Sequence, residues 1–452
     1  MLRTATRLGR VMALISCVSL AGLTLSAADW PALRGKGHLG VWEETGILEK
    51  FPADGLASRV RWRTPIKGGC SGAAVADGRV FVTDFVWTTR PKGTERALAL
   101  DEATGKILWT REWEADYTGA LSWDRKGPNV TPTVDGGHVY VLGASGMFLC
   151  LDAKTGEILW QHDLQQEYRN PPRGGMVRWG FASPAYPDGD LVLIKVNASD
   201  AKVVAFNKQS GKEVWRALPG KYDPALAPLT IINSGGTRQL IVWHDDGVAS
   251  LDPATGRVYW EFEEKRNPGD PNTLPVFTGD YLFFSSYYSG ASLWKLDKEK
   301  PSMPTRVWRS TSNSEIVTDA VHTLMSTAVV IGDYVYGVDA YGQLRCLKLE
   351  TGERIWESLA LVKERARHAS AQMIRNGDRI FSVTDLGDLV ISKFTPEGYQ
   401  EISRAHLIKP TIAATARRSS PKVQWAPPAF ANRHVIIRND EEIISVSLAA
   451  DQ

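Results

Sequence analysis

One pattern recurs along the chain about every fifty residues: small and large apolar residues alternate, and an acidic or amide residue, a Thr-Gly or Ser-Gly pair and a tryptophan follow. In one copy, Ala and Leu alternate over residues 97–100, Asp101, Thr104 and Gly105 follow, and Trp109 ends the pattern. A period of two predicts a half-buried strand, and the acidic residue with the glycine predicts a tight turn into a second strand. The phrase is therefore expected to form a β-hairpin.

Repetition of this hairpin predicts the fold. Its tryptophans lie 45 to 55 residues apart, a period typical of propellers and solenoids, and a further copy with a degraded turn lies near Ile402. Residues 60–62 form an outer strand without a blade, and the strands within residues 428–448 lack an outer partner. Pairing the two would close a ring and remove free sheet edges. We therefore predict an all-β, eight-bladed β-propeller of four-stranded antiparallel blades, closed by its N-terminal outer strand pairing with the C-terminal strands.

The residues that define the repeat are expected to be structural. Each tryptophan would bury a large apolar area between neighbouring sheets rather than form a ligand cage. The repeat residues are Trp62, Asp101, Gly105, Trp109, Asp152, Gly156, Trp160, Gly211, Trp215, Asp252, Gly256, Trp260, Trp308, Gly352 and Trp356.

Residues 1–28 have the pattern of a signal peptide: a basic start, an apolar stretch and a small-residue cleavage site at Ala27 or Ala28. Export to the periplasm or the extracellular space is expected, with lipidation of Cys17, as in an outer-membrane lipoprotein, as the alternative. No later stretch is long and apolar enough to span a membrane. Residues 29–57 are expected to be an N-terminal extension that packs on the propeller, and residues 58–450 the propeller itself.

Composition restricts the partners. Without the three arginines of the signal peptide, 50 basic residues face 51 acidic ones, so the mature chain has a net charge of −1. This balance argues against a nucleic-acid partner, which requires a basic stripe. The three mature cysteines are an odd number, and Cys150 and Cys346 occupy matching repeat positions, so buried apolar roles are expected rather than a disulfide. We expect a monomer.

At these repeats the chain resembles the pyrroloquinoline-quinone (PQQ)-like propeller superfamily, whose blades carry Ala-x-Asp-x-x-Thr-Gly-x-x-x-Trp. The resemblance covers residues 58–450. One branch of the superfamily contains PQQ- and calcium-dependent alcohol dehydrogenases of the periplasm. Another contains non-catalytic members similar to the propeller lipoprotein of the outer-membrane β-barrel assembly machine. The similarity is greatest to a third, largely uncharacterised group of secreted proteins that begins with Trp-x-x-x-Arg-Gly, which is Trp30 to Gly35 in this chain.

The chemistry that the PQQ enzymes of this superfamily require is not evident in the sequence. The chain has no adjacent cysteine pair to lie against the quinone, no Cys-x-x-Cys-His, and no Asp/Asn pattern matching the calcium ligands. His244, Asp245 and Asp246 form a dense cluster of potential metal ligands, but the following glycine favours a solvated β-turn. We therefore expect no catalytic residue, no metal and no cofactor, with PQQ and calcium as the alternative.

Long loops between blades should meet at one mouth of the central channel. They are rich in cations, aromatic residues and amides, which suits an anionic or sugar-like ligand or an unidentified protein partner. The alternative is that these loops are simply polar and that Trp179 and Trp425 pack on their neighbours. The candidate binding residues are Asn129, Arg173, Arg178, Trp179, His322, Arg367, His368 and Trp425.

Together these features predict an exported, non-catalytic binding propeller that acts in envelope protein assembly or binds a ligand at the channel mouth. The alternative is a PQQ- and calcium-dependent oxidoreductase of the alcohol or sugar dehydrogenase type.

Overall fold

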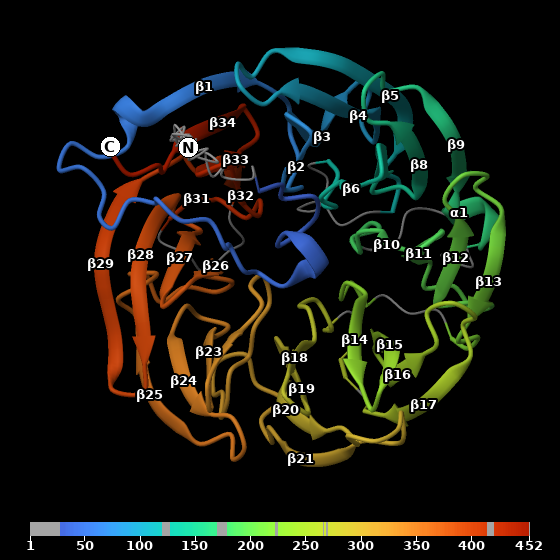
Figure 1. Cartoon of the computed structure of the whole chain (residues 1–452), viewed down its shortest axis with the longest axis vertical. Coiled ribbons are helices and arrows are strands. Elements are labelled where there is room, and N and C mark those ends of the chain that lie inside the picture. Colours follow the sequence, from blue (N-terminus) through green and yellow to red (C-terminus); the bar gives the residue numbers. More distant parts are fainter. Residues whose placement is uncertain are drawn as a thin grey trace, which may run out of the picture.

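Eight four-stranded antiparallel sheets surround a central axis (Figure 1). The structure is a computed structural model that describes residues 28–119, 127–169, 179–221, 225–264, 266–267, 270–413 and 420–451. The prediction of an all-β, eight-bladed propeller is confirmed. The α-helix found within these ranges is the single turn α1 (Leu164–Glu167), and no helix there is long and apolar enough to cross a membrane.

Each of the first seven blades uses four consecutive strands, from the inner strand to the outer one. Blade 1 contains β2 (Ala74–Ala76), β3 (Arg79–Trp87), β4 (Lys92–Asp101) and β5 (Ile107–Asp116). Blade 2 contains β6 (Thr133–Asp135), β7 (His138–Leu142), β8 (Met147–Asp152) and β9 (Ile158–Asp163). Blade 3 contains β10 (Tyr186–Asp188), β11 (Leu191–Lys195), β12 (Val203–Asn207) and β13 (Glu213–Ala217). Blade 4 contains β14 (Thr230–Ser234), β15 (Thr237–His244), β16 (Gly247–Leu251) and β17 (Val258–Glu263).

The remaining blades follow the same order. Blade 5 contains β18 (Val276–Thr278), β19 (Tyr281–Ser286), β20 (Gly290–Lys295) and β21 (Thr305–Arg309). Blade 6 contains β22 (Val329–Ile331), β23 (Tyr334–Val338), β24 (Leu344–Lys348) and β25 (Arg354–Ser358). Blade 7 contains β26 (Ala371–Asn376), β27 (Arg379–Thr384), β28 (Asp388–Thr395) and β29 (Gly398–His406). A small two-stranded sheet, β30 (Ile412–Ala413) with β31 (Lys422–Val423), lies between blades 7 and 8 in the sequence.

Blade 8 closes the ring with strands from both ends of the chain. Its inner strands are β32 (Ala429–Ala431), β33 (His434–Arg438) and β34 (Glu442–Ser447), and β1 (Val60–Pro65) is its outer strand (Figure 1). β1 and β34 are antiparallel, with Trp62 opposite Ser445 and Arg63 opposite Ile444. The predicted closure is confirmed, and it removes the free edges of both terminal segments.

The strand order divides the propeller into two faces. The connections between blades and the turns between second and third strands lie on one face, which we call the loop face. The turns between first and second strands and between third and fourth strands lie on the opposite face, which we call the turn face. Apolar cores fill the space between adjacent blades; one of them joins Phe81 and Ala99 of blade 1 to Val139 and Leu149 of blade 2.

Five of the seven repeat tryptophans donate a hydrogen bond to the next blade at the turn face. The indole Nε1 of Trp109 donates to the carbonyl of Ala153 at 3.1 Å, and that of Trp160 donates to the carbonyl of Lys208 at 2.7 Å. Trp62, Trp308 and Trp356 make the same contact to the next turn. The turns are held by their own polar residue: the Asp152 carboxylate accepts from the Thr155 amide at 2.7 Å.

The N-terminal extension crosses the ring at the turn face. Its residues bridge three blades: Trp30 pairs with Val75, Val41 with Arg375, and Ile47 with Ala449. Two 3₁₀ turns, η1 (Lys36–His38) and η2 (Ala57–Arg59), lie in this region, and Figure 1 shows the dark-blue segment passing over the centre of the ring. Trp42 is almost fully buried, with its ring 5.2 Å from that of Phe381 and 5.0 Å from that of Phe430. The exact domain boundaries and the signal-peptide cleavage stay predictions.

Candidate functional site on the loop face

Blade 1 rises above its neighbour on the loop face. Its strands β4 and β5 have 10 residues each, whereas β8 and β9 of blade 2 have 6. Four more residues at about 3.3 Å each extend the sheet by roughly 13 Å. Aromatic packing supports this extension: the Phe85 and Tyr117 rings stack with centroids 4.5 Å apart, and Trp87 packs edge-on against Phe85.

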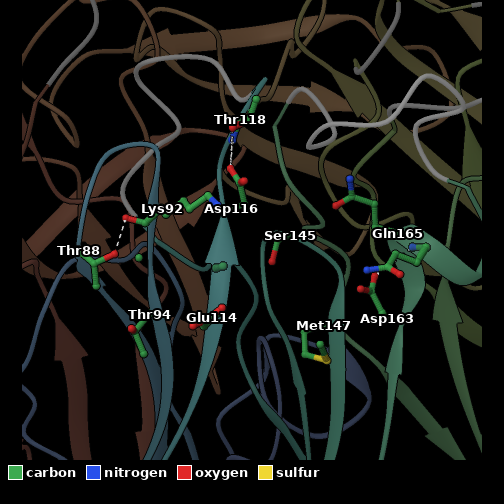
Figure 2. Close-up of a pocket in the computed structure, with 13 residues that line it drawn as sticks. Thr88, Lys92, Thr94, Glu114, Asp116, Thr118, Ser145, Met147, Asp163 and Gln165 are labelled. Carbon is green, nitrogen blue, oxygen red and sulfur yellow. Dashed lines mark hydrogen bonds between the residues drawn. The ribbon is translucent and has the colours of Figure 1, made fainter.

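A groove of about 730 Å³ lies between this extension and blade 2 (Figure 2). Lys92, Thr94 and Glu114 come from β4 and β5, and Met147 and Asp163 come from β8 and the end of β9. α1 contributes the amide side chains of Gln165 and Gln166. We call this space the blade 1–2 groove. Its lining mixes polar side chains with the apolar side chain of Met147.

Carboxylates dominate the charge of the blade 1–2 groove. Glu114, Asp116 and Asp163 line it together with one cation, Lys92. The Asp116 carboxylate accepts from the hydroxyl of Thr118 at 2.6 Å and from its amide at 2.9 Å, and these hydrogen bonds lower the pKa of Asp116. The Asp163 carboxylate accepts from the Gln166 amide at 3.0 Å and so caps α1. The groove therefore favours a cationic or hydrogen-bonding partner.

A buried carboxyl group lies next to the groove. Glu95 of β4 is fully buried and accepts from the Tyr117 hydroxyl at 2.6 Å, the Trp113 Nε1 at 2.7 Å and the Ala144 amide at 2.8 Å. Burial raises the pKa of Glu95, and the three hydrogen bonds partly offset that shift. Because Ala144 belongs to blade 2, Glu95 ties the extension of blade 1 to its neighbour.

A second polar cluster, which we call the Arg367 cluster, joins blades 5, 6 and 7 on the loop face. The Arg367 guanidinium donates to the Glu315 carboxylate at 2.7 and 3.1 Å and to the hydroxyls of Tyr287 and Tyr288, both at 3.2 Å. The Tyr341 hydroxyl donates to Glu315 at 3.1 Å. Burial alone would raise the pKa of Glu315, but the hydrogen bonds from Arg367 and Tyr287 lower it overall.

Four of the predicted binding residues meet around Tyr287. Arg367 bonds its hydroxyl, the His368 ring lies 5.1 Å from the Tyr287 ring, and the Trp425 ring lies 6.4 Å from His368. His322 lies beneath them with no exposed surface, its Nδ1 3.2 Å from the Tyr287 carbonyl oxygen and its Nε2 3.2 Å from the Ser310 hydroxyl. Arg367 and Trp425 keep partial exposure, whereas His322 supports the cluster from inside.

Two other predicted residues lie elsewhere on the loop face. The Asn129 side-chain amide donates to the Trp179 carbonyl at 3.4 Å, and both residues are half-buried. Arg173 and Arg178 lie outside the described residues. The structure therefore brings the predicted residues into two groups rather than one.

Sequence reasoning missed most of the residues that complete these sites. Tyr287, Tyr288 and Glu315 are in different connections, and nothing in their spacing joins them to Arg367. The Tyr-Tyr pair in a turn between two apolar strands is a usable signal, because aromatic residues are enriched at binding interfaces; Tyr288 is partly exposed, whereas Tyr287 is buried. The blade 1–2 groove depends on strand length, which the repeat pattern does not reveal.

A PQQ and calcium site would need metal-binding side chains gathered in one place. No group of three or more His, Cys, Asp or Glu side chains is gathered in this way in the described part of the chain. His244 ends β15 and pairs with Gly247, the first residue of β16, so the His-Asp-Asp cluster is a hairpin turn, but the His244 side chain is buried rather than solvated. Whether the chain binds a cofactor stays a prediction.

The fold and its repeats define a propeller of PQQ-like blades. The family model described as "Outer membrane protein assembly factor BamB" matches residues 53–124 and 93–358, and the chain belongs to this PQQ-like repeat family. The resemblance inferred from the repeats is thereby confirmed.

Curated relatives fall into two groups. Outer membrane protein assembly factor BamB of Shewanella oneidensis is 22% identical over 344 residues, 73% of this chain and 69% of that protein. The protein of the same name from Burkholderia pseudomallei is 24% identical over 242 residues, half of this chain and 54% of its own length. Quinoprotein ethanol dehydrogenase of Pseudomonas aeruginosa is 30% identical over 204 residues, 41% of this chain and 30% of that protein.

Solved structures agree on the fold. BamB from Moraxella catarrhalis superposes with a TM-score of 0.53 at 16% identity, covering 85% of this chain and 98% of that one. Quinohemoprotein alcohol dehydrogenase from Comamonas testosteroni superposes with a TM-score of 0.61 at 12% identity, covering 94% and 81%. At these identities the likeness concerns the fold alone.

Proposed function

We propose that this protein is an exported, non-catalytic binding propeller that takes part in envelope protein assembly. The observation that carries this proposal is the family match over residues 53–358, together with curated relatives named as outer membrane protein assembly factors. The fold alone would be a weak guide to function, because the same propeller fold occurs in enzymes and in binding proteins. The proposed partner is a protein, and the signal-peptide pattern supports export to the periplasm or the extracellular space, with an outer-membrane lipoprotein as the alternative.

The loop face is the proposed contact surface. It carries the Arg367 cluster, in which arginine and tyrosine side chains are partly exposed, and residues of these types are enriched among energetic hot spots. It also carries the blade 1–2 groove, whose volume of about 730 Å³ is large enough for several side chains of an extended segment. The turn face is partly covered by the N-terminal extension.

Site-specific photo-crosslinking in the native bacterium tests the proposal. A photoreactive amino acid replaces Thr88 at the rim of the groove or Tyr288 in the Arg367 cluster, and Lys154 on the turn face serves as the control position. Crosslinks from Thr88 or Tyr288 to a component or client of outer-membrane protein assembly, with none from Lys154, are expected. Crosslinks from Lys154 alone, or from none of these positions, would contradict the proposal.

A quinone-dependent oxidoreductase is the second candidate, favoured by the quinoprotein relatives. Thermal unfolding of the mature protein with PQQ, with calcium and with both separates the two functions. A ligand at about 100 times its dissociation constant stabilises a native state by roughly 2.7 kcal/mol, which a melting curve resolves. We expect no shift; a shift that requires both additions would favour the oxidoreductase.

A further inference from the structure

Arg34 of the N-terminal extension lies inside the ring with almost none of its hydrogen-bonding capacity used. The residue is 6% exposed. Its Nη1 donates to the carbonyl of Met373 in β26 at 3.2 Å, and its Nε is buried without an acceptor. Nη2 makes no hydrogen bond to any residue of the described ranges. A guanidinium has five N–H donors, of which one is matched by an acceptor in the described part of the chain, and the Nε–H is buried without one.

The charge of Arg34 is unbalanced as well. Burial lowers its pKa to about 10, and no carboxylate among the described residues offsets this effect. The guanidinium therefore stays protonated at neutral pH. A buried charge without a partner is strongly unfavourable, so native proteins supply either a counter-ion or a full set of acceptors.

The other buried arginines in the described part of the chain follow that rule. Arg266 pairs with Glu264 at 2.6 Å, and Arg345 pairs with Asp339 at 2.9 Å. Arg438 has no carboxylate in contact, but it donates to the carbonyls of Thr83, Lys67 and Asn439. Arg34 has neither a carboxylate partner nor several carbonyl acceptors among the described residues.

The surroundings of Arg34 are built to hold its guanidinium. Gly40 packs directly on it, since a Cβ at this position would lie 2.1 Å from Nη2 and 2.6 Å from Cζ. His38 lies close enough for the Arg34 charge to contribute to its titration, and burial lowers the pKa of His38 to about 4, so the ring is neutral at neutral pH. The His38 ring hydrogen-bonds to the backbone of Leu229, and its Nδ1 is buried without a partner. Because a neutral imidazole that donates from one nitrogen accepts at the other, His38 adds no donor for an anion, and the Arg34 guanidinium is the group that requires one.

We propose that Arg34 binds a small anion, a halide or a carboxylate group, where the N-terminal extension meets β26. Such an anion supplies in one step the counter-charge and the acceptors that the protein does not provide, and the planar fork of arginine suits a carboxylate. The bound anion ties the extension to blade 7 and so stabilises the closed ring. The proposal is independent of the function on the loop face.

Thermal unfolding of the mature, full chain at constant ionic strength tests the proposal. Sodium gluconate, whose anion is bulky, is replaced stepwise by sodium chloride, bromide, formate or acetate. We expect the melting temperature to rise by roughly 2–5 °C and then to saturate. If the site binds halides, the melting temperature saturates in the chloride and bromide series. If it binds carboxylates, the melting temperature saturates in the formate and acetate series.

Two arginine variants separate a specific anion from a general salt effect. Arg34→Met should lose the saturable rise, whereas Arg438→Met, which also removes a buried arginine, should keep it. If either variant fails to fold, crystals of the wild-type protein grown in bromide and in formate decide, with an anomalous bromide peak or a planar formate expected against the Arg34 guanidinium. A melting temperature that does not saturate with any of the four anions, or water at this position in both crystals, would overturn the proposal.

Discussion

The indole ring of Trp109 in blade 1 lies directly against Gly156 in blade 2. A Cβ atom at position 156 would be only 2.6 Å from Cδ2 of the Trp109 ring. The same relationship joins Trp62 to Gly105, Trp160 to Gly211, Trp215 to Gly256 and Trp308 to Gly352. The glycine of each repeat therefore does two things: it adopts a left-handed backbone conformation, and it leaves room for the tryptophan of the preceding blade. The repeat is a joint between blades rather than a feature of one hairpin.

Replacing this glycine should cost more than backbone strain alone. Gly156 has a φ of +71° and Gly78 has a φ of +72°, but a Cβ at Gly78 meets no atom within 4 Å. Gly78→Ala should reduce the free energy of unfolding by about 1 kcal/mol, the cost of a left-handed residue. Gly156→Ala should cost about 1–3 kcal/mol more, because the ring must move. Urea denaturation measures the free energy of unfolding of both variants. Equal losses would contradict a role of Gly156 in packing against Trp109.

The tryptophan side of the joint can be tested with two rings of matched burial. Trp160 is 9% exposed and Trp215 is 8% exposed. Trp160 donates its Nε1 to Lys208 at 2.7 Å, whereas the Nε1 of Trp215 is buried without an acceptor. Trp160→Phe should therefore lower the free energy of unfolding by about 1 kcal/mol more than Trp215→Phe, the net contribution of one hydrogen bond. A larger loss for Trp215→Phe would show that packing alone sets the cost.

The fold could be predicted because its information is local and repeated. Asp152, Gly156 and Trp160 sit within one short phrase, and each copy adds evidence for the same hairpin. The partner of each tryptophan could not be predicted in this way, because it lies in the next repeat. Trp260 is an example. The turn that follows it in the next blade, residues 296–304, lacks the Thr-Gly pair. The Trp260 Nε1 instead donates to the Gln239 side chain of its own blade at 3.0 Å.

The candidate site was predicted less completely for a related reason. Residue type and loop position point to Arg367, His368 and Trp425, and the structure brings them together around Tyr287. Glu315, which holds Arg367 in place, is 52 residues away in the sequence. Contacts between non-repeating loops depend on the three-dimensional path of each loop, which periodicity does not encode.

Glu95 should make stability depend on pH. Burial raises its pKa above the ordinary value of 4.5, so the native state takes up a proton between pH 4.5 and that raised pKa. The contribution of Glu95 to the free energy of unfolding is therefore fully present below pH 4.5. It is lost as the pH rises through the raised pKa of Glu95 in the native state. Relative to Glu95→Gln, the free energy of unfolding of the wild-type protein should fall with rising pH, by up to about 1.4 kcal/mol per pH unit within this window. Urea denaturation from pH 4 to pH 8 measures the difference.

A second substitution checks the cause of this pH dependence. The Tyr117 hydroxyl donates to Glu95 at 2.6 Å and lowers its pKa, against the effect of burial. Tyr117→Phe should therefore raise the pKa of Glu95 further and extend the window in which stability is lost to higher pH. A window that does not move would mean that Glu95 does not carry the dependence.

Arg367 should determine how well the loop face binds its partner. Its guanidinium bonds Glu315 and the hydroxyls of Tyr287 and Tyr288, so Arg367→Met would remove a partly exposed cation and free the Tyr288 side chain at the surface. Losses above 1.4 kcal/mol are common when an arginine hot spot is truncated, and this corresponds to a tenfold weaker complex. We expect the crosslink yield from Tyr288 in the native bacterium to fall accordingly, while far-ultraviolet circular dichroism shows an intact fold.

The control is Arg238→Met, because Arg238 forms an ion pair with Asp188 on the turn face. If Arg238→Met lowers the yield as much as Arg367→Met does, the loss reflects general surface charge, and the Arg367 cluster is not the contact surface.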